Sequence, residues 1–560
     1  MKSTIETLVG EEALVLLSNE HFQTQWDNLY ELCPWTTVFQ SKKFVMTWYN
    51  VYKKQYLPII VKATNGEQLS GLLLLAKSKR SIITAAGANR AEYQVWLTSE
   101  SDGEWFIKKT FSEVKKHFPN CDMILKFIPA KAPLEWVKTD SLWKNRCILR
   151  AFNHPLWILE NERITKSLRK QSNKINRLKK AGELTFEIIR NIEKFRSVID
   201  EVIVQFDFRK GAMYNTTPFQ EDPLRKELLL ELFKENFLHV SILKLNENII
   251  ACKVATKGDG CIILQGMSSH APSFANHSPG ILHFLMLGKL LSEEGYTMLD
   301  LTPGEDLYKQ QLATVNQQAY ELFFTGNVKS LFTIFSRKIY FDSIIKNKKY
   351  IYDALASVGI KKKTLKHNLR RIQIVKENFQ WGRKGSFGSF ITSLIHNDQT
   401  KARYKIYSVV KKDSIQHSIS IKKDSLKDLI KYKYGESKLL RGEFLTNAME
   451  KFENGEHVYT LTEDSCLLNC VWIKEQVNEF EFRSTRKKII FPNGSTILFD
   501  IYCHPNGIHK LKDFLISVTN IISANSSQNI YLISTNKLLQ PTFECETFIV
   551  RSDHTEVDSF

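Results

Sequence analysis

The chain has 560 residues, of which 43% are hydrophobic and 25% charged, a composition typical of folded globular proteins. This length exceeds what one hydrophobic core supports, so we expect about three or four domains. Lysine and arginine number 78 against 60 aspartate and glutamate residues, which gives a net charge of +18. The charge predicts an anionic partner but does not choose among a CoA phosphate, nucleic acid, an acidic membrane surface and an acidic polymer.

Three features that the sequence lacks narrow the class of protein further. No window approaches the roughly 18 to 20 apolar residues that cross a bilayer, so we expect no transmembrane segment. Glu6, Glu11 and Glu12 stand where a signal peptide would need basic and then uninterrupted apolar residues, so we expect a cytoplasmic protein. The nine cysteines show no repeated spacing, and no second pair follows Cys466 and Cys470, so we assign no metal.

The first 160 residues read as one α/β unit. The apolar spacing of residues 20–52 is helical, and Pro34 divides it into two amphipathic helices. Two apolar segments on either side of an Asn-Gly turn pair then predict a β-hairpin. The unit is expected to continue with a helix at 104–117 and a strand at 123–128.

Residues 162–180, ERITKSLRKQSNKINRLKK, predict one basic helix with a narrow apolar face, which Gly182 ends. Its lysines and arginines could form an ordinary solvated surface or a docking surface for an anionic donor or acceptor. Charge alone leaves both interpretations open.

Residues 238–326 carry the most informative pattern of the chain. Three apolar segments separated by Asn-Glu-Asn and Gly-Asp-Gly turns predict an antiparallel meander. Ser278, Pro279 and Gly280 then open an apolar helix, and a strand at 296–301 follows it. A loop of small residues leading into a helix N-terminus leaves unpaired backbone amides at the positive end of the helix dipole, which suits a pyrophosphate.

The remaining chain divides into two parts. Residues 331–400 are basic and contain Gly- and Ser-rich sequence, so we expect a partly helical connector there. Residues 401–560 predict a further α/β domain. Its expected helices are 424–434 and 444–453, and its expected strands are 458–461, 467–473, 497–502 and 530–534.

Taken together, the motifs HVSILKLNENIIACKVA, CIILQGMSS, NHSPGILHFLMLGKLLSEEGY and LDLTPGEDLYKQQLA resemble the acetyltransferases of cellulose and exopolysaccharide biosynthesis, a branch of the GNAT superfamily. The segment FQSKKFVMTWY and the hairpin after it extend the resemblance to about residues 20–330. The resemblance implies an α/β fold of tandem GNAT-like mixed sheets flanked by helices, as in Fem-type aminoacyltransferases. We expect GNAT-like domains at 1–160 and 161–330, and a degenerate GNAT-like domain at 401–560.

The resemblance implies an acyltransferase that uses acetyl-CoA or another acyl-CoA as co-substrate and holds no permanent cofactor. The expected acceptor is an amine or hydroxyl, such as that of a sugar or polysaccharide precursor, and attacks the thioester directly. The residues expected to bind the donor are Gln265, Gly266, Met267, Ser278, Pro279, Gly280 and Ile281. The expected catalytic residues are Asp300, Glu305 and Tyr308, and those expected to bind the acceptor are Arg209, Lys309 and Arg169.

Some of these assignments have structural alternatives. Asp300 ends a buried strand and could be a general base or the anchor of a loop, and Tyr308 could protonate the departing thiolate or pack. The aromatic residue that follows the arginine in relatives is Lys210 here, which weakens a substrate role for Arg209. Two other functions compete with acyl-CoA chemistry: aminoacyl-tRNA-dependent transfer of the Fem type, and non-catalytic binding of an anionic polymer. No long helical hairpin for gripping tRNA is evident, so a nucleic-acid partner is not expected.

Overall fold

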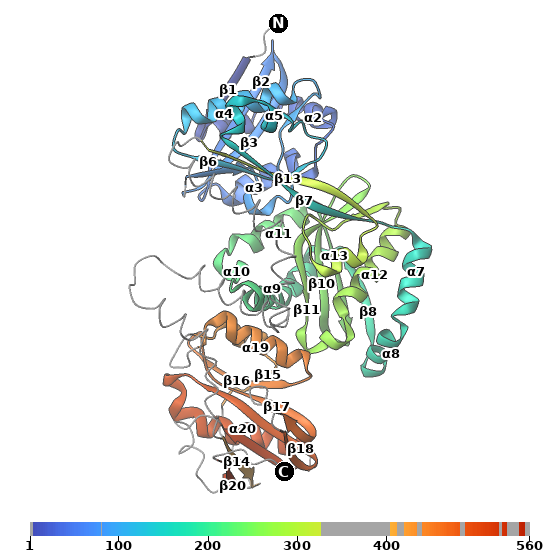
Figure 1. Ribbon diagram of the computed structural model, residues 1–560, viewed down its shortest axis with the longest axis vertical. Coiled ribbons are helices and arrows are strands. Elements are labelled where there is room, and N and C mark those ends of the chain that lie inside the picture. Colours follow the sequence, from blue (N-terminus) through green and yellow to red (C-terminus); the bar gives the residue numbers. More distant parts are fainter. Residues whose placement is uncertain are drawn as a thin grey trace, which may run out of the picture. The chain divides into compact units, whose positions relative to one another are not determined.

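The computed structural model describes residues 4–79, 81–325, 404–410, 419–433, 439–481, 488–525, 529–534 and 548–554 (Figure 1). They form two compact units. The described residues of the first lie within Met1–Val202, Asp222–Ser269 and His277–Lys362, and those of the second within Ile203–Glu221, His270–Asn276 and Lys363–Phe560. Among the described residues, no helix has the length and hydropathy needed to cross a membrane.

One mixed sheet organises the first unit, and its strand order is β1-β2-β3-β4-β6-β13-β7-β12-β11-β10-β9-β8, with β5 paired to β3. The strands of its first part are β1 (Thr4–Val9), β2 (Leu57–Asn65), β3 (Gln68–Lys77), β4 (Ile82–Ala85), β5 (Leu97–Thr98), β6 (Asp122–Pro129) and β7 (Cys147–Ile158). Those of its second part are β8 (Leu184–Ile189), β9 (Leu238–Leu245), β10 (Asn248–Lys257), β11 (Cys261–His270), β12 (Met298–Asp300) and β13 (Val315–Thr325).

The helices of the first half of this unit are α1 (Glu11–Leu17), α2 (Glu20–Leu32), α3 (Lys42–Tyr52), α4 (Gly103–His117), α5 (Trp136–Thr139) and α6 (Ser141–Lys144). Those of the second half are α7 (Asn161–Lys170), α8 (Ser172–Ala181), α11 (Leu224–Lys234), α12 (Pro279–Glu293) and α13 (Leu307–Leu312). Two further helices, α9 (Ile192–Tyr214) and α10 (Pro218–Glu221), bridge the sequence between α8 and α11. The second unit begins within α9 at Ile203.

The sheet is an internal repeat with exchanged final strands. Each half runs strand, helices, antiparallel meander, long helix and parallel strand: β1 to β6 around α4, and β8 to β12 around α12. The next strand of each half crosses over, because β7 pairs with β12 while β13 pairs with β6. Strands β7 and β13 also pair with each other and run side by side in Figure 1. The two halves therefore share one sheet.

Local sequence explains the elements near the site. Gly66 turns the β2–β3 hairpin with a φ of 63°, a left-handed conformation that glycine adopts without steric cost. The apolar face of α12 packs on the sheet and on Trp157 of β7. Gly288 is required there, because a Cβ atom at this position would lie 2.5 Å from the Trp157 ring.

The second unit contains a seven-stranded sheet of order β15-β16-β17-β18-β19-β14-β20. Its strands are β14 (Tyr404–Val409), β15 (Lys422–Lys423), β16 (His457–Glu463), β17 (Cys466–Glu481), β18 (Lys488–Cys503), β19 (Ile530–Ser534) and β20 (Phe548–His554). Its described C-terminal helices are α18 (Leu426–Ile430), α19 (Arg441–Glu453) and α20 (Ile508–Asn525). Antiparallel β16, β17 and β18, then α20 and parallel β19, repeat the order β9 to β12.

The mixed α/β class, the β2–β3 hairpin and the meander at β9–β11 are confirmed. The single helix predicted at 162–180 is wrong, because the backbone turns at Gln171 and separates α7 from α8. The helix predicted at 424–434 is limited to α18. The connector predicted at 331–400 lies outside the described residues, and the four domain boundaries remain predictions.

Candidate active site

The parallel strands β11 and β12 separate after a short paired stretch. Their register runs from Cys261–Met298 to Ile263–Asp300, where β12 ends, while β11 continues to His270. The part of β11 beyond Ile263 therefore has no pairing with β12. Two donor residues predicted from the sequence, Gln265 and Met267, lie on this part.

These two residues also line a small cavity. Its volume is about 20 Å³, and Arg90, Glu92 and Arg225 contribute charged side chains to its lining. Gly266, the third predicted donor residue on this part of β11, is exposed and has a φ of 62°. The part of β11 that is not paired with β12 therefore places its backbone beside the charged side chains that line this cavity.

The N-terminus of α12 carries the second part of the predicted donor site. Ser278 is its N-cap residue in the left-handed conformation, with a φ of 53°, and Pro279 occupies the first helical position. The amide of Ile281 donates to the carbonyl of Ser278 at 3.0 Å. Pro279 has no N–H group, so Gly280 supplies the predicted amide donor of the first turn that has no partner among the described residues.

A lysine from the basic helices reaches this N-terminus. The ammonium of Lys174, on α8, donates to the hydroxyl of Ser278 at 2.9 Å. Helix α7, which precedes α8, packs beside α12 (Figure 1). Two features that the sequence separately suggested for an anionic donor, the basic segment and the Ser-Pro-Gly loop, therefore meet in the structure.

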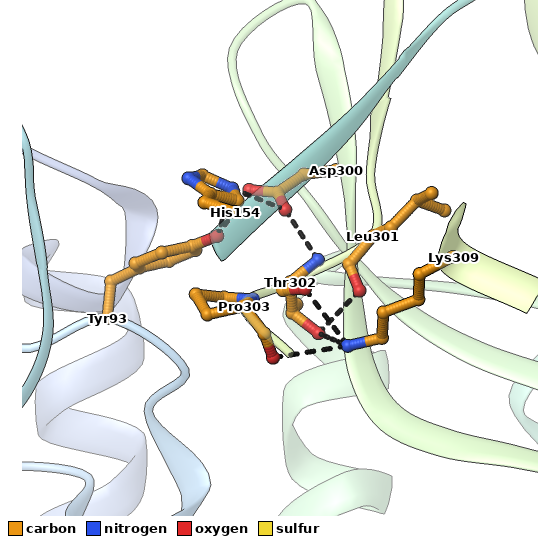
Figure 2. A network of polar contacts seen from close by, with 7 residues as sticks. All are labelled: Tyr93, His154, Asp300, Leu301, Thr302, Pro303 and Lys309. Carbon is orange, nitrogen blue, oxygen red and sulfur yellow. Dashed lines mark hydrogen bonds and ion pairs between the residues drawn. The ribbon is translucent and has the colours of Figure 1, made fainter. Parts of the chain in front are cut away.

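Asp300 lies at the end of the paired stretch and at the centre of a polar cluster, which Figure 2 shows from close by. One carboxylate oxygen accepts from the hydroxyl of Tyr93 at 2.7 Å. The other lies 2.9 Å from Nε2 of His154 and accepts from the amide of Thr302 at 2.7 Å. Tyr93 and His154 also contact each other at 2.7 Å. Asp300 is only 5% exposed, so these contacts hold a carboxylate that is almost removed from water.

Lys309, predicted to bind the acceptor, is buried and already has oxygen partners. Its ammonium donates to the carbonyl of Thr302 at 2.9 Å, to the hydroxyl of Thr302 at 3.2 Å and to the carbonyl of Pro303 at 3.2 Å (Figure 2). Burial is the main cause that lowers the pKa of Lys309. Asp300 and Lys309 thus hold the loop after β12 from its two sides.

The other predicted catalytic residues lie on or near α13. Tyr308 stacks on Phe284 of α12 with ring centroids 5.2 Å apart, and Glu305 is exposed. Cys261 begins β11, and burial raises the pKa of its thiol to about 12. Such a thiol is protonated at neutral pH and is a poor nucleophile.

The two predicted acceptor arginines belong to different units of the chain. Arg169 is exposed near the end of α7. Arg209 lies on the part of α9 that belongs to the second unit, and its guanidinium is 3.4 Å from Nδ1 of His270.

Two residues of the cluster were missed by sequence reasoning. Tyr93 comes from a loop of the first half, and His154 comes from β7, the strand that crosses between the halves. No local motif marks either residue. The pairing of β7 with β12 brings His154 to the end of β12.

Residues 165–310 match a family described as an acetyltransferase (GNAT) domain. The match covers the basic helices, the meander, the α12 loop and most of α13, and supports a transferase in this segment. The narrower resemblance to acetyltransferases of cellulose and exopolysaccharide biosynthesis is not confirmed. A comparison with curated proteins finds no match.

Several solved structures are similar in part of the chain. FemX is 10% identical with a TM-score of 0.40, over 56% of this chain and 98% of its own. A tandem GNAT protein from the clavulanic acid biosynthesis pathway is 10% identical with a TM-score of 0.35, over 58% and 99%. A conserved protein of unknown function from Bacteroides thetaiotaomicron is 11% identical with a TM-score of 0.35, over 54% and 97%. These scores are low, so the description of the fold rests on the topology of this chain itself.

Proposed function

We propose that this chain is a cytoplasmic acyl-CoA-dependent acyltransferase that transfers an acyl group directly to an amine or hydroxyl. The observation that carries the proposal is the contact between Lys174 and Ser278 at the N-terminus of α12. This contact places a cation beside helix amides and the positive end of the helix dipole, an arrangement that favours a phosphate group.

The donor would be held by the N-terminus of α12 and by the unpaired edge of β11. Gly280 and Lys174 would bind the pyrophosphate of CoA, with Ser278, Pro279 and Ile281 shaping the turn. The unpaired edge of β11 at Gln265, Gly266 and Met267 would accept the pantetheine arm. When bound, the thioester supplies an activated acyl group, and no covalent intermediate on Cys261 is needed.

The acceptor must lose a proton during transfer, and Asp300 is our proposed source of basicity. Its contact with Nε2 of His154 can fix the imidazole so that Nδ1, which has no hydrogen-bond partner among the described residues, accepts that proton. A buried carboxylate that orients a histidine is a recurring arrangement for general-base chemistry. Glu305 is a second candidate base. Tyr308 is the candidate acid for the thiolate.

We propose a sugar or polysaccharide precursor as the acceptor class, as the resemblance implies. Arg169 and Arg209 are proposed to contact an acidic acceptor. Lys309 is proposed to act on the acceptor through the loop that it holds, since three oxygens already surround its ammonium.

Calorimetric titration of the full chain tests the proposal. Acetyl-CoA should bind and should raise the melting temperature, because a ligand bound by the native state alone stabilises it. Release of free thiol from acetyl-CoA, with and without amino sugars, should then report turnover. Binding of aminoacyl-tRNA without binding of acetyl-CoA would favour Fem-type transfer. Binding of only an acidic polymer or acidic vesicles would show a non-catalytic binder.

A further inference from the structure

A second cavity lies at the opposite end of α12 from the proposed donor site. Its volume is about 400 Å³, and residues from the ends of β8, α11, β10 and α12 and from the start of β9 line it. Helix α12 has 15 residues, so its two ends are roughly 20 Å apart. The cavity is therefore separate from Lys174 and Ser278, and its size is within the range of small-molecule sites.

The polar lining includes a buried histidine without partners. His239, the second residue of β9, is 5% exposed, and neither ring nitrogen has a hydrogen-bond partner among the described residues. Burial, followed by the charges of Lys257 and Arg190, lowers the pKa of His239 to about 4. Both nitrogens of the neutral ring are buried beside the cavity and leave one donor and one acceptor unpaired within the described part of the chain.

Two cations lie beside this histidine. The ammonium of Lys257 donates to Asn236 Oδ1 at 2.5 Å, and the guanidinium of Arg190 pairs with Glu294 at 2.9 Å. Burial and then the positive charge of Arg190 lower the pKa of Lys257. With one carboxylate for two cations and a neutral histidine, the lining keeps one positive charge. An anion between Lys257 and Arg190 would relieve their repulsion.

The rest of the lining is apolar. Phe233 of α11 is held against Phe195 with ring centroids 4.7 Å apart, and Tyr296 and Ile188 also contribute to the wall. A bare inorganic ion would leave this wall exposed to water. A ligand with an apolar body would cover it and gain from the buried area.

We propose that this cavity binds a small organic anion, a carboxylate or phosphate monoester on an apolar body. The anionic group lies between Lys257 and Arg190, His239 makes a hydrogen bond to the ligand, and the body packs on Phe233 and Tyr296. This site does not depend on the proposed acyltransferase function, because none of its residues belongs to the donor end of α12 or to the Asp300 cluster.

Calorimetric titration of the full chain with four probes tests the site: benzoate, phenyl phosphate, inorganic phosphate and uncharged benzamide. Benzoate or phenyl phosphate should bind at least tenfold more tightly than benzamide and inorganic phosphate. Equal binding of benzamide would overturn the anion requirement. Binding of inorganic phosphate as tight as that of phenyl phosphate would overturn the apolar body.

Three variants locate the binding. Lys257→Met and Arg190→Met should each weaken the anionic probe about tenfold, and His239→Leu should weaken it roughly three- to tenfold through one lost hydrogen bond. Lys289→Met is the matched control. Lys289 lies on α12 near the end that borders the cavity, but it pairs with Glu293 at 3.8 Å and is not part of the cavity lining. Arg190 has a side chain 75% exposed, so its replacement should leave folding intact even where Lys257→Met does not. Unchanged affinity in folded Arg190→Met and His239→Leu would overturn the site.

Discussion

The two halves of the large sheet have the same order of elements but differ at the N-terminus of their long helix. In the first half, α4 begins at Gly103, where an added Cβ atom would lie 2.7 Å from both Trp35 and Pro133. Its first turn also carries Glu104, which pairs with Lys108. A covered and acidic N-terminus leaves no room for a phosphate and repels it.

In the second half, α12 has no acidic residue in its first turn, and Lys174 contacts its N-cap. The end of the following strand differs as well. In the paired registers of the two halves, Asp300 on β12 takes the position that Ile124 has on β6. Duplication of a fold thus does not duplicate its chemistry, since the groups that could bind an anion and accept a proton gather in the second half.

The strongest way to sharpen this difference is to remove the carboxylate of Asp300. Asp300→Asn keeps the shape of the side chain and should lower turnover by about 10² to 10⁴-fold, the usual contribution of general acid–base catalysis. His154→Gln should lower turnover similarly, and the double variant should lose little more, because the two residues act together. Tyr308→Phe should lower turnover by at least about tenfold if Tyr308 protonates the thiolate.

Thiol release per folded molecule, measured beside a denaturant melt of each variant, separates catalysis from anchoring. If Asp300 only anchors the loop, Asp300→Asn would cost roughly 1 to 3 kcal/mol of stability while the rate stayed near normal. Near-normal rates for all three variants would contradict the mechanism.

The second prediction uses the buried histidines, which the second half places between sheet and helix. His239 has a pKa of about 4, and His283, which contacts the hydroxyl of Ser241 at 2.8 Å, has a pKa lowered mainly by burial. The buried face of α4 has no histidine; Phe106, Phe111 and Val114 are buried there, together with Thr110.

The unfolded chain takes up protons on these histidines as the pH falls through about 6.5, whereas folded His239 does so only near pH 4. Stability is therefore fully present above about pH 6.5 and decreases on acidification, by roughly 3 kcal/mol for His239 alone. The protection factors of amides in peptides from β9 and α12, which are corrected for the slower intrinsic exchange at low pH, should fall between pH 6.5 and 4, and less so in His239→Leu. A slope unchanged in that variant would show that His239 does not contribute.

The third prediction compares a valine substitution at the N-terminus of α12 with one at the N-terminus of α4. Gly280→Val should keep the fold and weaken acetyl-CoA binding roughly tenfold or more, because a branched side chain crowds the approach of phosphate to the amides. Gly103→Val should instead destabilise the fold. Its side chain would collide with Trp35 and Pro133 and cost about 1 to 3 kcal/mol, without changing the affinity of the protein that folds. Calorimetry with acetyl-CoA and thermal melts of both variants measure these opposite effects on affinity and stability.

Much of the fold could be predicted because its signals are local. Turn residues and alternating apolar positions locate the hairpin and the β9–β11 meander, and Ser278-Pro279 marks the start of α12. The break at Gln171 carries no glycine or proline, and the basic segment therefore read as one helix. The exchange of β7 and β13 depends on pairing between distant strands, which no local pattern encodes.

The same distinction applies to the site. Asp300 and the α12 loop were found because each stands at a strand end or a helix start. His154 is 146 positions from Asp300 and Tyr93 is 207, so their contacts depend on tertiary structure that no local pattern encodes. The carboxylate of Asp222, which lies one residue before the N-cap Pro223 of α11, accepts from Tyr52 and Arg90 of the first half, contacts that no local pattern marks.

The smallest expected effect concerns Lys174, which most directly expresses the difference between the two helix N-termini. Lys174→Met should weaken acetyl-CoA about tenfold, because hydrogen bonds to charged groups contribute roughly 1.5 to 3 kcal/mol and this half-exposed lysine is partly screened. Lys108→Met, at the acidic start of α4, is the matched control and should leave the affinity unchanged. Raising the ionic strength should weaken binding to the parent chain more than to Lys174→Met, since one charge contact is already missing from the variant. Ser278→Ala completes a double-mutant cycle: if the hydroxyl positions the ammonium, the two losses should be less than additive. Full additivity with an equal salt dependence would mean that Ser278 does not position Lys174 for the donor, and that the donor's phosphates lie elsewhere.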